Sequence, residues 1–119
     1  MNKMQDLLVG LRRAPGVKGA AVLTSDGLVA ASALDAACNA DALAGLASYL
    51  LVTTGRALRD GAMGGCARVT VHASNGKALF VDLDGTSLVV LFDQFADPAA
   101  ARREVDDAAT RLRRLQRLG

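Results

Sequence analysis

The chain has 119 residues, of which 51% are hydrophobic and 22% are charged, and its formal net charge is +2. This length predicts one domain over residues 1–119, and no apolar run approaches the ~20 residues that span a bilayer. The balance of charges argues against a nucleic-acid binder. Because the first residues lack a secretory leader, we expect a cytoplasmic protein without membrane insertion.

The first part of the chain predicts a short helix followed by a hairpin. Residues 1–13 carry apolar side chains at helical spacing, with charged side chains away from that face. Residues 17–24 and 28–33 have the apolar character of strands. The Asp26-Gly27 pair between them is typical of a tight hairpin turn, because glycine adopts positive φ at little cost.

The last part of the chain predicts three strands and a closing helix. Strands are expected over residues 67–73, 77–83 and 86–92, joined by Asn-Gly and Asp-Gly pairs that favour hairpin turns. Asp97-Pro98 then opens the last helix, since aspartate caps a helix and proline suits its first position. With a middle helix before these strands, the order is helix, two strands, helix, three strands, helix.

The apolar pattern of the strands also predicts their places in the sheet. Residues 86–92 are apolar on both faces, as in a central strand, whereas residues 67–73 alternate and resemble an edge strand. If the first strand lies beside the last, the antiparallel sheet has the order 2-1-5-4-3. Residues 28–33 and 67–73 are then its two edges.

The middle helix, residues 39–60, carries two apolar stripes, although a surface helix needs only one. We expect the first stripe to face the core: Leu43, Leu46, Ala47, Leu50, Thr54, Ala57 and Leu58. The second stripe consists of small or apolar residues, and we expect another protein to cover it: Ala44, Ser48, Leu51 and Gly55. An unpaired edge strand also favours pairing with a second copy, so the residues predict a homodimer.

The block PGVKGAAVLTSDGLVAAS resembles the opening of the Roadblock family, which includes dynein light chains and bacterial MglB-type proteins. Its most specific part is Pro15-Gly16-Val17 with Gly19 and the Asp26-Gly27 turn, and the later strands and last helix fall where the family places them. The resemblance covers nearly the whole chain. It implies an α/β sandwich with the five-stranded sheet flanked by three helices, a topology similar to longin and profilin domains.

The resemblance also implies how the chain associates with partners. Family members dimerise by joining sheets at the third strand and packing the middle helices together, and they bind or regulate Ras-like small GTPases without a cofactor. Carried over by position, the sheet-joining edge comprises Arg68, Val69, Thr70, Val71 and His72, and the helix contact comprises Ala44, Ser48, Leu51 and Gly55. A related chain in place of one copy would give a heterodimer.

Candidate contacts for a GTPase are Arg56 and Arg59 on the polar side of the middle helix, where solvated surface residues are the ordinary interpretation. We predict no catalytic residue, because His72 is the single histidine and lacks a plausible nucleophile partner. Cys38 and Cys66 lack metal-ligand spacing, so no metal is expected. A scaffold subunit without GTPase regulation and a small-ligand sensor are the alternatives.

Overall fold

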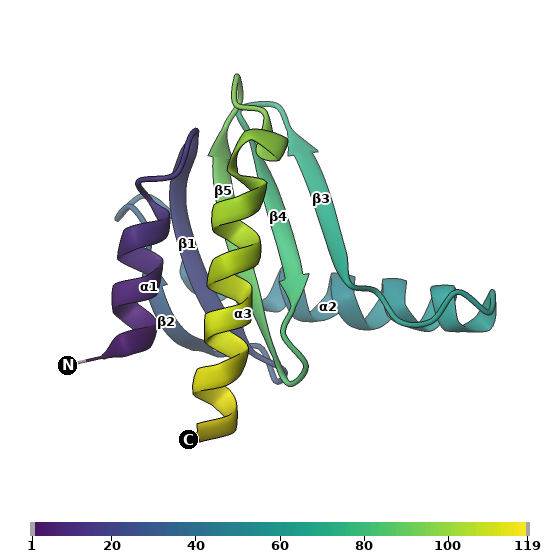
Figure 1. The fold of residues 1–119 in the computed structure, drawn as a ribbon. Helices are drawn as coiled ribbons and strands as arrows, with labels where there is room; N and C mark the ends of the chain where they lie inside the picture. Colours follow the sequence, from purple (N-terminus) through teal and green to yellow (C-terminus); the bar gives the residue numbers. More distant parts are fainter. Residues whose placement is uncertain (1, 119) are drawn as a thin grey trace.

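The helices and strands of this chain form close to their expected bounds, because polar side chains cap the helices and turn residues separate the strands. The computed structural model describes residues 2–118. Figure 1 shows the arrangement of its elements. In chain order they are α1 (Lys3–Leu11), β1 (Val17–Thr24), β2 (Val29–Ala33), α2 (Ala40–Asp60), β3 (Arg68–Ala73), β4 (Gly76–Asp82), β5 (Thr86–Asp93), a 3-10 turn η1 (Pro98–Ala101) and α3 (Arg102–Leu118).

Two helix starts illustrate how single side chains set these bounds. The Asn39 side chain accepts a hydrogen bond of 3.1 Å from the amide of Ala42, which identifies Asn39 as the cap of α2. Asp97 accepts from the amide of Ala99 at 3.0 Å, with Pro98 directly after it. The last helix therefore starts where expected, although its first turn is the 3-10 turn η1.

The sheet is antiparallel throughout and has the order β2-β1-β5-β4-β3, which confirms the predicted order. The central strand β5 has Val89 and Val90 fully buried on its two faces. β3 is an edge strand, and its residues alternate between exposed and half-buried, with Val69 and Val71 half-buried. The sequence pattern thus located both the centre and the edges of the sheet.

Each face of the sheet has its own apolar core. The larger core lies between the sheet and the helix pair α1 and α3, and includes Leu8, Val22, Val90 and Val105. The smaller core lies between the sheet and α2, and is formed by Ala21, Leu23, Ala44, Ala47, Phe80 and Val89. Figure 1 shows α1 and α3 on the near face of the sheet and α2 behind it.

Two glycines are required because a neighbouring segment approaches closely. Gly16 has φ +74°, and a Cβ there would overlap the Cβ of Ala96. A Cβ on Gly76 would lie 2.9 Å from the carbonyl oxygen of Phe92 on the neighbouring strand β5. The glycine in the Asn75-Gly76 turn between β3 and β4 is thus explained by the close approach of β5, and not by a positive φ at Gly76.

The helix α2 is longer than its own sheet requires. Its residues that pack in the smaller core end at Leu51, nine residues before the helix ends at Asp60. In Figure 1 the C-terminal half of α2 extends past the edge strand β3, and the chain then returns to start that strand. Among residues 2–118, no helix has both the length and the apolar character needed to cross a bilayer.

Candidate interaction surface

One of the two edges of the sheet is the backbone of β3, which has a neighbour only in β4 within the described chain. Val69 and Val71 point to the α2 face, since they pair with Phe80 and Ala78, which belong to or pack against the smaller core. Thr70 and His72 are exposed on the opposite face. A strand with free amides and carbonyls of this kind can pair with a further strand.

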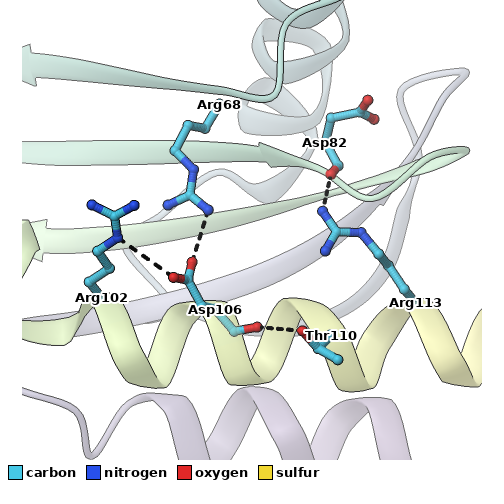
Figure 2. A network of polar contacts seen from close by, with 6 residues as sticks. All are labelled: Arg68, Asp82, Arg102, Asp106, Thr110 and Arg113. Carbon is cyan, nitrogen blue, oxygen red and sulfur yellow. Dashed lines mark hydrogen bonds and ion pairs between the residues drawn. The ribbon is translucent and has the colours of Figure 1, made fainter.

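Arg68 differs from the other residues of this edge, because its side chain turns back over the sheet. Its guanidinium donates a hydrogen bond of 2.9 Å to Asp106 on α3, as Figure 2 shows. Arg102 lies 3.6 Å from the same carboxylate. The hydrogen bond from Arg68, aided by the charge of Arg102, lowers the pKa of Asp106 from its usual value.

A second contact joins α3 to the sheet at the end of β4. Arg113 donates to the carbonyl oxygen of Asp82 at 2.9 Å (Figure 2). The hydroxyl of Thr110 donates to the backbone carbonyl of Asp106 within α3. These contacts fix α3 against the two strands nearest the open edge, so Arg68 has a structural role. The spacing of 38 residues between Arg68 and Asp106 left no signal in the sequence.

The predicted orientation of α2 is wrong. Ala44 and Gly55, expected to face outward, are buried, and Leu51 packs against the smaller core. Ser48 donates from its hydroxyl to the carbonyl of Ser25 at 3.1 Å, so it too faces its own chain. The second stripe therefore lies toward the sheet and the loop before β3. Small residues allow the helix backbone to approach the small Ala21 on β1.

Of the first stripe, expected in the core, Ala47 is fully buried, and most of the other residues form a flank of α2 that remains partly open. Leu46 is 43% exposed, and Leu43 and Leu50 are half-buried. We define the open flank as Leu43, Leu46, Leu50, Thr54 and Ala57. The observation of two apolar stripes is thus correct, and Ala47 and Leu50 of the first stripe contact the core as expected. The helix is turned so that the second stripe also faces its own chain.

A groove of about 450 Å³ runs beside this flank, over the end of the sheet where β3 ends and β4 begins. Its floor and walls are mainly apolar, and it opens between α2, the segment before α2, and four strands. We call it the apolar groove, defined by Leu34, Leu43, Leu46, Val71, Ala78 and Leu91. The apolar groove leaves no signal in the sequence, because it forms only where α2 lies across the sheet.

The opposite side of α2 carries the two candidate arginines. Arg56 is exposed on the outer surface of the helix, next to the exposed Tyr49 and Val52 at helical spacing. Arg59 instead turns toward a small cavity of about 220 Å³, with its guanidinium beside Gly65. The structure therefore separates the two arginines, and Arg56 is the one on an open surface.

Within residues 2–118, no three His, Cys, Asp or Glu side chains are grouped so that they could hold a metal ion. Cys38 is half-buried, Cys66 is buried, and both are free thiols. His72 is exposed on β3. The features brought together by the fold are thus surfaces for other macromolecules: an open strand edge, an open helix flank and the apolar groove.

Comparison with known proteins finds Roadblock/LC7 domains both by sequence and by structure. A family model for the Roadblock/LC7 domain matches residues 3–92. An uncharacterized protein of Methanocaldococcus jannaschii is 30% identical over 107 residues, covering 90% of this chain and 94% of that protein. A Roadblock/LC7 domain from Streptomyces avermitilis has a TM-score of 0.85 at 30% identity, covering 94% of this chain and 96% of that one. Myxococcus xanthus MglB has a TM-score of 0.91 at 15% identity, covering 100% and 98%, which shows a common fold.

Proposed function

The chain belongs to the Roadblock/LC7 family, and we propose that it is a dimeric, non-enzymatic adaptor that binds a Ras-like small GTPase and modulates its GTP hydrolysis. The observation that carries the proposal is the fit between two features of one chain. One is the half of α2 that extends past β3, and the other is the apolar groove that α2 leaves open.

A two-fold axis normal to the sheet relates these features. Antiparallel pairing of β3 with β3 of a second copy keeps both α2 helices on the same face of a continuous sheet. The axis reverses the strand direction, so each extending half of α2 crosses the partner's sheet at the end that the partner's own helix leaves open. That end holds the apolar groove, and the two open flanks then meet each other.

This arrangement gives the residues of the edge and of α2 revised roles. Val69, Thr70 and Val71 supply the strand pairing, with Arg68 and His72 at either side of them. The helix contact moves from Ala44, Ser48, Leu51 and Gly55 to the open flank, because the former residues face their own chain. The same geometry accepts a related chain in place of one copy.

Oligomeric state tests the dimer. Leu46→Glu and Ala57→Glu place a charge on exposed positions of the open flank, so each should give monomers that keep their helical circular dichroism. Val52→Glu lies on the other side of the same helix and should remain dimeric. The measurement is light scattering after size exclusion. Dimers in both flank variants would place the interface elsewhere and contradict the proposal.

The proposed GTPase contact is the outer surface of α2, which dimerisation leaves uncovered. Tyr49, Val52 and Arg56 lie together there, and an aromatic residue beside an arginine is the composition that dominates many protein interfaces. Arg59 lies at the margin of this surface. An arginine supplied to a GTPase can stabilise charge on the transferred phosphoryl group.

Binding of Ras-like GTPases from the same genome, loaded with GDP or with a non-hydrolysable GTP analogue, tests this contact. We expect Tyr49→Ala and Arg56→Ala to weaken binding about tenfold or more, with the dimer intact. Arg103→Ala, on the opposite face of the sheet, is the control and should bind normally. GTP turnover by the GTPase, measured with and without this protein, then distinguishes a regulator of GTP hydrolysis from a scaffold subunit. Unchanged turnover with retained binding identifies a scaffold subunit, whereas no binding to any such GTPase contradicts the proposal.

A further inference from the structure

The charges of this protein are divided between its two helical layers. Residues 2–13 and 102–118, which contain α1 and α3, carry nine basic and four acidic side chains. The rest of the chain carries five basic and eight acidic side chains. The small overall charge of +2 therefore conceals a layer of net charge +5 on one face of the sheet and an acidic remainder.

The basic layer contains a groove between its two helices, with an open volume of about 670 Å³. We call it the basic groove, lined by Lys3, Asp6 and Leu7 of α1 and by Arg111, Arg114 and Leu115 of α3. Leu7 and Leu115 are half-buried and form an apolar floor, with Leu7 packed against the larger core. Figure 1 shows α1 and α3 side by side, so the groove follows the line between them.

The cations of the basic groove are only partly neutralised by the protein itself. Arg111 forms an ion pair of 3.2 Å with Asp107 on its own helix. No ion pair among the described residues involves Lys3 or Arg114, and both side chains are exposed. Asp6 is the one carboxylate in the lining. Three cations thus surround an apolar strip with a single acid at one side.

We infer that the basic groove binds an acidic, amphipathic segment of another protein. Apolar side chains of that segment contact Leu7 and Leu115, and its carboxylates pair with Lys3, Arg111 and Arg114. Arginine is suited to this task because its guanidinium presents a planar fork of donors to a carboxylate. Asp6 favours a segment with an amide or a cation at that position, which orients the segment in the groove.

Two other anionic partners fit the same face less well. Nucleic acids are held by basic grooves with aromatic side chains for base stacking, and the basic groove has no aromatic residue in its lining. Membrane-surface helices project large apolar side chains outward. Among the described side chains of α1 and of residues 102–117, Val9 is the one large apolar side chain that is exposed. A shallow groove with two half-buried leucines between its cations matches a polypeptide segment that brings its own apolar side chains.

The inference is independent of the proposed dimer and GTPase contact, because the basic groove lies on the other face of the sheet. In a two-fold dimer both basic grooves lie on the same face. Monomeric Leu46→Glu protein should therefore bind the same segment as the native protein does. If the native protein proved to be a monomer, the inference about the basic groove would be unchanged. If the basic groove bound no acidic segment, the proposed function would be unchanged.

The test uses a synthetic helical peptide of about 14 residues, with leucines along one face and glutamates elsewhere. Nuclear magnetic resonance of the full chain labelled with nitrogen-15 should show amide shifts concentrated at residues lining the basic groove. A peptide with serine in place of leucine should bind at least about tenfold more weakly, because the apolar contact is lost. Binding should also weaken as salt rises from about 50 to about 300 mM.

Matched variants locate the binding site. Lys3→Glu combined with Arg114→Glu should lower the affinity for the acidic peptide by about tenfold or more. Arg114→Glu alone should still weaken binding, whereas Arg103→Glu, the same single charge reversal on α3 about three turns from Arg114, should leave the affinity unchanged. Equal binding by the Arg114→Glu and Arg103→Glu variants, or shifts outside the groove, would overturn the inference. It would also be overturned if vesicles containing phosphatidylserine bound through Lys3 and Arg114 while the peptide did not.

Discussion

At the scale of single residues, Arg68 connects the edge strand β3 to α3, which lies on the face of the sheet opposite α2. Its guanidinium reaches Asp106 on α3, and Arg102 approaches the same carboxylate. Both partners are 40% to 45% exposed, so solvent screens the pair and its contribution to stability is modest. The pair nevertheless connects the side chain of Arg68 on the edge strand β3 to α3.

Replacing Asp106 with asparagine tests this contribution. At about pH 7 we expect Asp106→Asn to lower the free energy of unfolding by less than about 1 kcal/mol, because the pair is exposed. Since the pKa of Asp106 is lowered on folding, the charged form stabilises the fold above the pKa of the unfolded chain. This stabilisation is lost as pH falls through the folded pKa. The native protein and the variant should therefore converge in acid.

Urea unfolding followed by circular dichroism at neutral and acidic pH measures the effect. Asp107→Asn is the control, because Asp107 pairs only with Arg111 within α3 and should show the smaller loss of an exposed helical pair. A loss of stability for Asp106→Asn that stays constant down to about pH 2 would show that charge is not its cause.

At the scale of elements, α2 shows what an apolar pattern predicts and what it leaves open. The periodicity correctly identified a helix with two stripes, and strand patterns gave the full sheet order. Periodicity alone does not specify which stripe faces the sheet. Ala44 and Ala47 decided this, because small side chains let the helix lie close to Ala21 of β1, and larger leucines remained at the flank.

The small residues on both sides of this contact are visible in the sequence, since Ala21 of β1 follows the small residues Gly19 and Ala20. Matching those small residues with the small stripe of α2 would have given the correct orientation. The apolar groove and the Arg68 contact had no such signal. Both depend on the angle at which helices cross the sheet, which local sequence does not determine.

Glycines at the ends of elements and within them should respond oppositely to alanine. Gly16→Ala should lower the free energy of unfolding by about 2 kcal/mol or more, because φ is +74° and the new methyl group meets Ala96. Gly45→Ala should raise it by about 0.5–1 kcal/mol, since Gly45 is an exposed interior position of α2 with open space around it. Urea unfolding at one protein concentration measures both. Destabilisation by Gly45→Ala would indicate a covered position and contradict the exposed assignment.

At the scale of the whole molecule, the sheet separates two surfaces with different chemistry. The α2 side is apolar at its open flank and apolar groove, whereas the α1 and α3 side is basic. An adaptor needs separate surfaces if it is to bind its own copy, a GTPase and a further protein at the same time. The open flank and apolar groove are present because α2 covers only part of its face of the sheet, and the basic groove lies between α1 and α3 on the other face.

The proposed dimer should be visible in the thermal stability of the protein. If folding and association are coupled, each tenfold rise in protein concentration stabilises the dimer by about 1.4 kcal/mol. With typical unfolding entropies for two chains of this length, the melting temperature should rise by about 3 °C for each tenfold. Leu46→Glu should abolish this dependence, because the monomer unfolds alone, and Val52→Glu should retain it. Circular dichroism melts over about a hundredfold range of concentration would show the effect. A melting temperature of the native protein that does not depend on concentration would show that the chain unfolds as a monomer. The open flank would then gain no stability from contact with a second copy.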